Sequence, residues 1–430
     1  MDVTPVRRIL DGECTGRKVR VRGWLHRHRS TGGLVFAIVR DATGIVQVAI
    51  KKGRVPDADF DAVETTSIEA SLVVEGEVSE DRRAPGGYEL RATSVRLHGP
   101  STDFPIYRDQ SPEHLLDVRH LWVRSQHISK ALKLRAATIR AMREWFEGRG
   151  FTEVHPPLIT GSACEGGATV FTFDYFGQEA YLTQSSQMYL ETLVFGLENV
   201  YCLQPSFRAE KSRTTKHLTE FWHLEAEEAW VDNDGNMRLQ EELVAHTAQR
   251  VAQLVPDVLR ELGRDPAELD AIKAPFPRLH YDKAIDEIQA KGVDISWGDD
   301  FGVPHEQALT AELDTPLFVT HFPAKIKAFY MALDDDKVHA KCADLLAPKG
   351  FGEIIGGSER SEDIDLMTTR LVNEGADPKE YEWYLDLRRW GSVPHSGFGL
   401  GIERVVRWFG NIEHIRDTIP FPRTINRCRP

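Results

Sequence analysis

The chain has 430 residues, of which 41% are hydrophobic and 28% charged, and this length is enough for two or three folded domains. Its net charge of -13 argues, taken alone, against nucleic-acid binding, and no run of 18 apolar residues is present to span a membrane. Because the five cysteines are scattered and the N-terminus lacks an apolar leader, we expect a cytoplasmic protein with reduced thiols.

The first 100 residues form one predicted domain made of short strands. Alternating apolar residues, separated by turn sequences, predict strands at 18–25, 34–40, 45–50, 71–78 and 88–97. About five strands in this length are typical of a small Greek-key barrel, the OB-fold, although the pattern alone also allows a β-sandwich. Residues 101–124 are expected to be a hinge.

This first domain is more basic than the rest of the chain. Residues 1–100 contain 16 Lys or Arg and 14 Asp or Glu, a net charge of +2, whereas the remainder carries -15. Residues 1–40 alone have nine basic and three acidic residues, a net charge of +6. A basic module on an acidic body can bind a polyanion locally, although a solvated basic face is an equally good explanation.

Residues 125–430 form the second predicted domain, of the α+β class. A helix is predicted from Ser125 to about Arg149, because apolar side chains recur there at helical spacing. Residues 236–320 are helix-rich with Gly and Pro breaks, and we interpret them as an insertion without readable chemistry.

The segment 207–227 predicts a strand, a polar loop and a second strand. Alternation on the second strand separates two sets of side chains. One set faces a core: Trp222, Leu224 and Ala226. The other set resembles the floor of a polar pocket: Phe221, His223, Glu225 and Glu227. Arg208 and Glu210, on the preceding strand, suit a phosphate and an amine, and Phe221 offers a flat surface for a base, which together suggest ATP on an open sheet.

A second segment, 397–404, supports this interpretation. Gly397, Gly399 and Gly401 alternate along a predicted strand, so one face is bare and a flat ligand can approach the backbone. A helix is predicted to begin near Glu403, which places Arg404 at the end of that strand as a phosphate contact. The chain has no GxxxxGK[ST] motif, which argues against a P-loop enzyme.

Taken together, these segments resemble the signature motifs of the class II aminoacyl-tRNA synthetases. Residues 207–225 resemble motif 2, residues 397–404 motif 3, and residues 128–157, which end in GFTEVHPP, motif 1. The resemblance covers nearly the whole chain and is closest to the aspartate/asparagine subgroup. It implies an α+β architecture: an N-terminal OB-fold β-barrel that binds the anticodon, then a catalytic domain built on an antiparallel β-sheet flanked by helices. It also implies a homodimer formed through motif 1.

The resemblance implies ATP and Mg²⁺ as cofactors. Arg208 and Arg404 match the family's catalytic arginines. The ATP site implied by the family comprises Arg208, Glu210, His217, Leu218, Phe221, Glu353, Gly401 and Arg404. Glu353 also matches a magnesium ligand, and Asp344 is a second candidate. Gly356 stands where some aspartate enzymes have a serine, which leaves the ligand set there open.

The amino-acid pocket decides the substrate within the subgroup. Glu165 and Gln187 match residues that hold the α-amino group, and Arg360 matches the arginine that takes the side-chain oxygen. Leu190 replaces a lysine of the aspartate enzymes, and Glu225 replaces an aspartate; both changes favour L-asparagine and tRNA(Asn). The alternative is an aspartate enzyme, either specific for its own tRNA or charging both tRNAs.

In the barrel, the resemblance implies that Phe36 and Gln47 stack on and read the central anticodon base. Arg29 is then a phosphate contact, and core packing is the alternative for Phe36. Two other possibilities are a catalytically inactive tRNA-binding relative and a stand-alone amide-forming enzyme. The intact arginines argue against the first, and the barrel argues against the second.

Overall fold

The computed structural model describes residues 2–107, 109–164, 169–211, 214 and 216–430. Two compact units make up the chain, Met1–Ser111 and Pro112–Pro430. The second unit begins with two short helices, α3 (Pro112–Asp117) and α4 (Arg119–Trp122), inside the segment expected to be a hinge. Among the described residues, no helix combines the length and the apolar character needed to cross a bilayer.

The N-terminal unit is a closed five-stranded barrel with the order β1-β2-β3-β5-β4. Its elements are α1 (Val6–Leu10), β1 (Lys18–Thr31), β2 (Leu34–Arg40), β3 (Ile45–Lys51), α2 (Asp57–Thr65), β4 (Ser71–Glu80) and β5 (Tyr88–Gly99). Alternate residues of each strand fill the core, such as Val35, Ala37 and Val39 of β2. Closure of the barrel confirms the OB-fold, and the sandwich alternative is wrong.

Strand β1 is longer than the predicted 18–25. Residues up to Trp24 pair with β4, residues from Trp24 onward pair with β2, and the register shifts between Leu25 and Arg27. A bulge of this kind bends a strand sharply, so β1 can serve both sides of the barrel. At the bend, a Cβ atom on Gly23 would lie 2.2 Å from the carbonyl oxygen of Arg40, so only glycine fits there.

The C-terminal unit is built on an eight-stranded sheet with the order β12-β13-β14-β15-β16-β11-β10-β6. The strands are β6 (Thr152–Glu153), β10 (Asn199–Phe207), β11 (Glu220–Ala229), β12 (Arg278–His280), β13 (Leu317–Thr320), β14 (Cys342–Ala347), β15 (Gly352–Glu359) and β16 (His395–Gly401). The central pairs are antiparallel, and the two outermost pairs, β12 with β13 and β6 with β10, are parallel.

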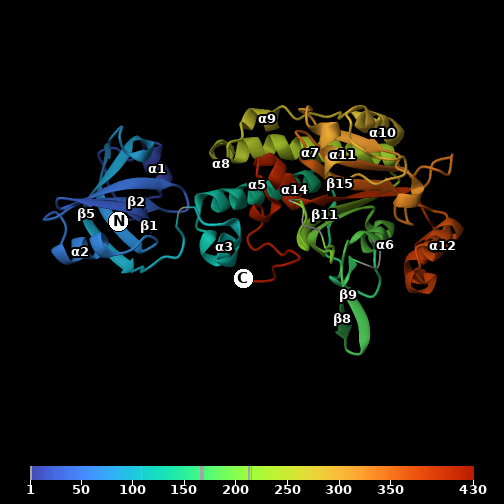
Figure 1. Cartoon of the computed structure of the whole chain (residues 1–430), viewed down its shortest axis with the longest axis horizontal. Coiled ribbons are helices and arrows are strands. Elements are labelled where there is room, and N and C mark those ends of the chain that lie inside the picture. Colours follow the sequence, from blue (N-terminus) through green and yellow to red (C-terminus); the bar gives the residue numbers. More distant parts are fainter. Residues whose placement is uncertain (1, 108, 165–168, 212–213, 215) are drawn as a thin grey trace. The chain divides into compact units, whose positions relative to one another are not determined.

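Helices α5 (Gln126–Gly148), α7 (Asn233–Leu254) and α14 (Ile402–Phe409) cover one face of this sheet (Figure 1). Apolar residues from these helices and from the sheet, among them Leu224, Ala226 and Leu400, form the main core. The predicted helix at 125–149 is confirmed as α5, and the hydroxyl of Ser125 caps it by accepting the N–H of Ile128 at 3.2 Å. The opposite face of the central strands is therefore left for polar side chains.

The remaining elements surround this framework. A three-stranded sheet, β7 (Ile159–Thr160), β9 (Gln178–Leu182) and β8 (Phe171–Tyr175), projects from the C-terminal unit (Figure 1). The other α-helices are α6 (Gln187–Leu197), α8 (Pro256–Glu261), α9 (Pro266–Asp270), α10 (Tyr281–Ala290), α11 (Val303–Thr310), α12 (Ile364–Asn373) and α13 (Glu382–Arg389). The segment 236–320 is helix-rich, as predicted, but it also supplies β12 and β13, which extend the sheet.

Candidate active site

The polar face of the central strands forms the floor of a cavity of about 660 Å³. The predicted alternation of β11 is correct: Leu224 and Ala226 lie in the core, and the other set lines the cavity. That set is Phe221, His223, Glu225 and Glu227. Strand β11 therefore separates a hydrophobic layer from a site rich in carboxylates.

Arg208 and Glu210 line the same cavity, but they lie just beyond the end of β10 instead of on it. The backbone N–H of Arg208 donates to the carbonyl of Thr219 at 3.0 Å, which holds the first residue of the loop against the next strand. The Arg208 guanidinium lies 5.6 Å from the ring centroid of Phe221. An aromatic surface and a cation suited to a phosphate thus lie side by side.

The glycines of β16 do leave one face bare, but protein side chains fill part of it. A Cβ atom on Gly399 would lie 2.5 Å from Nε2 of His223, and one on Gly397 would overlap the Glu227 carboxylate. Gly399 and Gly401 line the cavity, whereas Gly397 does not. The space beside Gly397 and Gly399 is therefore occupied by side chains of β11, which lie across β16. The end of the strand near Gly401 is the part that is open to a ligand.

The structure brings the predicted nucleotide residues together around this cavity. All eight line it: Arg208, Glu210, His217, Leu218, Phe221, Glu353, Gly401 and Arg404. Burial and the nearby Arg404 lower the pKa of His217 to about 4, so its imidazole is neutral at pH 7. Among the amino-acid-site predictions, Gln187, Glu225 and Arg360 also line the cavity, and Glu165 lies outside the described residues.

The prediction that Leu190 faces the substrate is wrong. Leu190 is fully buried in an apolar cluster with Val194, Val200, Cys202 and Ala229, and it does not line the cavity. The reason is the phase of α6, which begins at Gln187. Residues four apart share a helix face, so Glu191, not Leu190, continues the face that begins with Gln187. The Gln187 side-chain amide donates to Glu191 at 2.9 Å.

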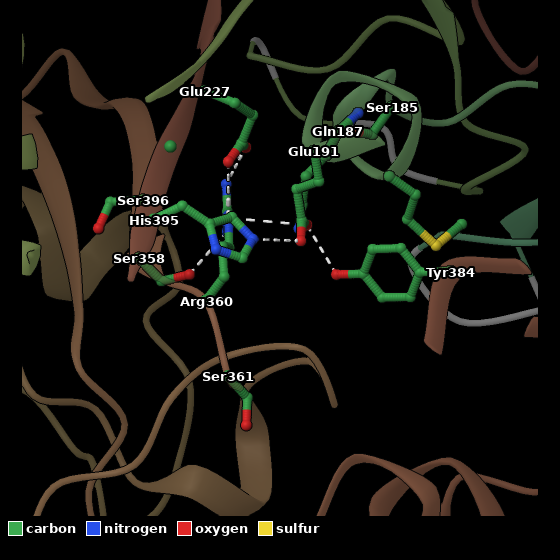
Figure 2. A network of polar contacts seen from close by, with 12 residues as sticks. Ser185, Gln187, Glu191, Glu227, Ser358, Arg360, Ser361, Tyr384, His395 and Ser396 are labelled. Atoms are coloured by element: carbon green, nitrogen blue, oxygen red, sulfur yellow. Dashed lines mark hydrogen bonds and ion pairs between the residues drawn. The ribbon is translucent and has the colours of Figure 1, made fainter. Parts of the chain in front are cut away.

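Glu191 is the centre of a buried polar network (Figure 2). Its carboxylate accepts hydrogen bonds from Nη2 of Arg388 at 2.6 Å and from the hydroxyl of Tyr384 at 2.7 Å, and it lies 3.0 Å from Nε2 of His395. The side chains of Glu191, Arg388 and His395 are 0% exposed. Burial alone raises the pKa of Glu191, but Arg388, His395 and Arg360 outweigh it and lower the pKa, so the carboxylate is ionised.

The network reaches the cavity through Arg360. Its Nε lies 3.9 Å from Glu191 and donates to Glu227 at 3.2 Å, while Nη2 also contacts Glu227. Its Nη1 donates to the hydroxyl of Ser358 at 2.7 Å. Burial raises the pKa of Glu227, but its direct ion pair with Arg360 opposes this shift and in turn raises the pKa of Arg360. The guanidinium that faces the cavity is thus held between two carboxylates.

Glu225 is held by the N-terminal end of α6. One carboxylate oxygen accepts the backbone N–H of Ser186 at 2.8 Å, and the other accepts the hydroxyl of Ser185. Nδ1 of His223 lies 3.4 Å from the same carboxylate. Glu225 is 3% exposed, so its orientation in the cavity is fixed by these contacts.

Glu353 and Asp344 meet on the bare side of Gly356. A Cβ atom there would lie 3.5 Å from Oδ1 of Asp344 and 3.7 Å from Oε1 of Glu353. Lys327 donates to Asp344 at 2.7 Å, and Arg404 pairs with Glu353 at 3.2 Å. Two convergent hard oxygen donors fit Mg²⁺, and the glycine leaves space where a serine would stand.

These two carboxyl groups differ in acidity. Burial raises the pKa of Asp344 to about 6, although Lys327 opposes the shift. Burial also acts on Glu353, but Arg404, Lys216 and Lys327 outweigh it and lower its pKa to about 2. At neutral pH both groups therefore offer anionic oxygens to a divalent cation.

Several cavity residues were not predicted from the sequence. Lys216, from the polar loop, donates to Glu306 of α11 at 2.6 Å, and both line the cavity. Residues 236–320, in which no chemistry could be read from the sequence, therefore contribute Glu306 to the lining of the cavity. A pair separated by 90 positions has no local sequence signal. Glu227, by contrast, belongs to the predicted polar face of β11 and lines the cavity as expected.

The candidate anticodon residues lie on the outer face of the barrel. Phe36 is half-buried and stands outside the barrel core, so the core-packing alternative is wrong. Arg29 pairs with Phe36 in the β1–β2 register, and its guanidinium lies 4.8 Å from the Phe36 ring centroid. Gln47, on the adjacent strand, donates to Glu89 at 2.8 Å. These residues offer a flat ring, a cation and a polar amide on one surface.

Comparison with known proteins places this geometry in a family. Residues 111–425 match the model of tRNA synthetases class II (D, K and N), and residues 19–97 match an OB-fold nucleic acid binding domain. The chain is 48% identical over 419 residues to the asparagine–tRNA ligase of Thermococcus gammatolerans, and 97% of each chain is covered.

Two solved structures are similar to the chain in both sequence and fold. The asparaginyl-tRNA synthetase of Pyrococcus horikoshii complexed with asparaginyl-adenylate is 46% identical with a TM-score of 0.95, and all of both chains is covered. The Entamoeba histolytica enzyme in complex with asparaginyl-adenylate is 32% identical with a TM-score of 0.88, and 96% of this chain and 97% of that chain are covered. The chain therefore belongs to the class II tRNA synthetases of the D, K and N group, and within them to the asparagine–tRNA ligases.

Proposed function

We propose that the chain activates L-asparagine with ATP and transfers the asparaginyl group to the 3′ end of tRNA(Asn). The observation that carries the choice of substrate is the charge balance around Arg360, which lies between the carboxylates of Glu227 and Glu191. An aspartate carboxylate entering next to this balanced cation also approaches Glu225. At about 4 Å and an effective dielectric of about 20, two such charges repel by about 4 kcal/mol. A neutral amide avoids this cost.

The chemistry follows from the positions of the cations. In the first step, the asparagine carboxylate attacks the α-phosphorus of ATP, the bond to pyrophosphate breaks, and the adenylate forms. Arg208 stabilises charge on the α-phosphate, while Arg404 and the neutral His217 contact the terminal phosphate. Phe221, beside Arg208, supports the adenine, with Glu210, Leu218 and Gly401 at its edges. Positioning and electrostatics supply most of the rate in such a reaction.

Glu353 and Asp344 would hold Mg²⁺ in this site. When bound, the ion neutralises charge on the phosphate oxygens. Gln187 holds the α-amino group, Arg360 takes the side-chain carbonyl oxygen, and Glu225 accepts from the amide NH₂. Glu165 remains a predicted contact to the α-amino group. In the second step, the terminal ribose hydroxyl of the tRNA attacks the adenylate carbonyl, and AMP leaves.

The remaining assignments complete the proposal. Residues 1–100 bind the anticodon through Phe36, Gln47 and Arg29, the hinge lies within residues 101–111, and residues 112–430 carry the catalysis. The enzyme acts as a homodimer in the cytoplasm, where its tRNA is used in translation. Support comes from the basic N-terminal segment and from the family.

The decisive experiment is ATP–pyrophosphate exchange with asparagine or aspartate as the only amino acid. Charge repulsion and unpaired buried polar groups together should favour asparagine by about 10⁴-fold in kcat/KM. Equal or higher activity with aspartate would instead support the aspartate enzyme, and aminoacylation of tRNA(Asn) and tRNA(Asp) would then show whether it charges both. Absence of exchange with either amino acid would indicate the inactive tRNA-binding relative.

Phe36→Ala should weaken tRNA(Asn) binding by about 1–3 kcal/mol, because one base loses its stacking surface. Strand pairing stays intact, since Phe36 lies outside the barrel core. Binding is measured by filter retention or fluorescence anisotropy, and exchange without tRNA serves as the control and should not change. A large loss of exchange in the folded variant would contradict the assignment of this surface to tRNA.

A further inference from the structure

A second group of metal-type ligands lies in the catalytic unit, and none of its members lines the cavity described above. His280 ends β12, Asp282 lies in the first turn of α10, and His339 lies in the loop that precedes β14. One donor atom from each residue lies within 4.8 Å of the others. Residues 57 positions apart in the chain are thus brought to one point.

The spacing of the donor atoms fits a single ion. Nε2 of His339 lies 3.4 Å from Oδ1 of Asp282, and Nδ1 of His280 lies 3.6 Å from Oδ2 of Asp282. Around a tetrahedral Zn²⁺, with bonds of about 2.0–2.2 Å, neighbouring donor atoms are about 3.4 Å apart. With one donor atom taken from each residue, the separations stay within 4.8 Å, so side-chain rotations that shorten the longer ones would complete a coordination shell.

Two of the three donors are already oriented by neighbours. Nδ1 of His339 lies 2.6 Å from a carboxylate oxygen of Asp336, so the ring is fixed with Nε2 directed toward Asp282. A carboxylate on the distal nitrogen is the usual support of a metal-binding histidine. The indole N–H of Trp297 donates to Asp282 at 2.7 Å and holds the carboxylate in place.

His280 is the third donor, and its ring is also constrained. It stacks on His321 with a centroid distance of 5.1 Å, and its Nδ1 accepts the backbone N–H of Asp282 at 3.2 Å. Coordination through this nitrogen exchanges that long hydrogen bond for a metal bond. The side chains of His280 and Asp282 are 37% and 49% exposed, so an ion can enter from solvent and retain a water as its fourth ligand.

We propose that His280, Asp282 and His339 form a binding site for a divalent transition metal, with Zn²⁺ as the best fit. Two imidazoles and one carboxylate select such an ion over Mg²⁺, which prefers oxygen ligands only. This set of ligands differs from that of Glu353 and Asp344, which offer oxygen atoms alone and suit Mg²⁺. The bound ion ties the start of α10 to the loop before β14 and so braces the β12 edge of the sheet.

The test is a calorimetric titration of the chelator-treated full chain with ZnCl₂ in excess Mg²⁺. We expect one Zn²⁺ per chain, and loss of this site in His339→Ala. Asp336→Asn, which keeps an oxygen for the local backbone N–H groups but removes the carboxylate behind His339, should weaken binding about 10- to 100-fold. His120→Ala removes an exposed histidine of α4 and should leave binding unchanged.

Two results would overturn the proposal: no stoichiometric Zn²⁺ binding by the wild type, or equal binding by His339→Ala and the wild type. If His339→Ala does not fold, as judged by circular dichroism, Asp336→Asn decides instead, and wild-type affinity in that variant counts against the site. Asparagine-dependent pyrophosphate exchange without zinc should be the same in all three variants. The Zn²⁺ site and the amino-acid activity can therefore fail independently.

Discussion

Arg208→Ala should abolish adenylate formation while the fold stays intact. The side chain lies outside the core clusters, and the backbone N–H that binds Thr219 remains in the alanine variant. What is lost is a charge-assisted contact to the reacting phosphate, which should cost roughly 3 kcal/mol or more in the transition state, a decrease of more than about 100-fold in kcat/KM. Pyrophosphate exchange measures this loss, and thermal unfolding checks the fold.

Two further arginine variants sharpen the test. Arg208→Lys keeps the charge but not the planar pair of donors, so it should recover only part of the activity. Arg260→Ala removes an exposed arginine that pairs with Asp257 on the surface of α8, and it should behave like the wild type. Normal exchange kinetics in Arg208→Ala would remove this residue from the mechanism.

Features set by local pattern could be predicted from the sequence. The barrel strands follow from alternation, because one face of each strand must fill a closed core. The same argument assigned Phe221 and His223 to the polar side of β11, and the serine cap with helical spacing located α5. These predictions depend on neighbours within a few residues, which the sequence contains directly.

Features set by long-range contact could not be predicted. The Lys216–Glu306 pair depends on the packing of α11 against the polar loop. Arg388 and His395, the polar partners of Glu191, are about 200 positions away from it in the chain. The error at Leu190 has another origin. One helical residue is 100° of rotation, so matching a family position without knowing where α6 begins cannot separate Leu190 from Glu191.

Glu191→Gln should lower both the stability and the amino-acid selectivity of the enzyme. Removing one charge from a buried ion network leaves its partners uncompensated and typically costs about 3–5 kcal/mol. Glutamine keeps the shape, so the protein should still fold. With Glu191 neutral, Arg360 is balanced by Glu227 alone, and the pocket becomes more favourable for an aspartate carboxylate. The ratio of kcat/KM for asparagine to that for aspartate should therefore fall.

The pH dependence of the free energy of unfolding is a second measure of the contribution of the Glu191 carboxylate. The network lowers the pKa of Glu191 below its ordinary value of 4.5, so the folded state binds the proton more weakly than the unfolded state does. The resulting stability is fully present above pH 4.5 and is lost as the pH falls further. The free energies of unfolding of the wild type and Glu191→Gln, measured in urea, should consequently differ by a large amount at pH 7 and by less in acid. Glu382→Gln, a charge removal at an exposed pair with Arg389, is the control and should show almost no difference at either pH. A small difference in the free energy of unfolding at pH 7 would mean that the charge of Glu191 does not stabilise the fold. An unchanged selectivity ratio would mean that Glu191 does not balance the charge of Arg360 in the pocket.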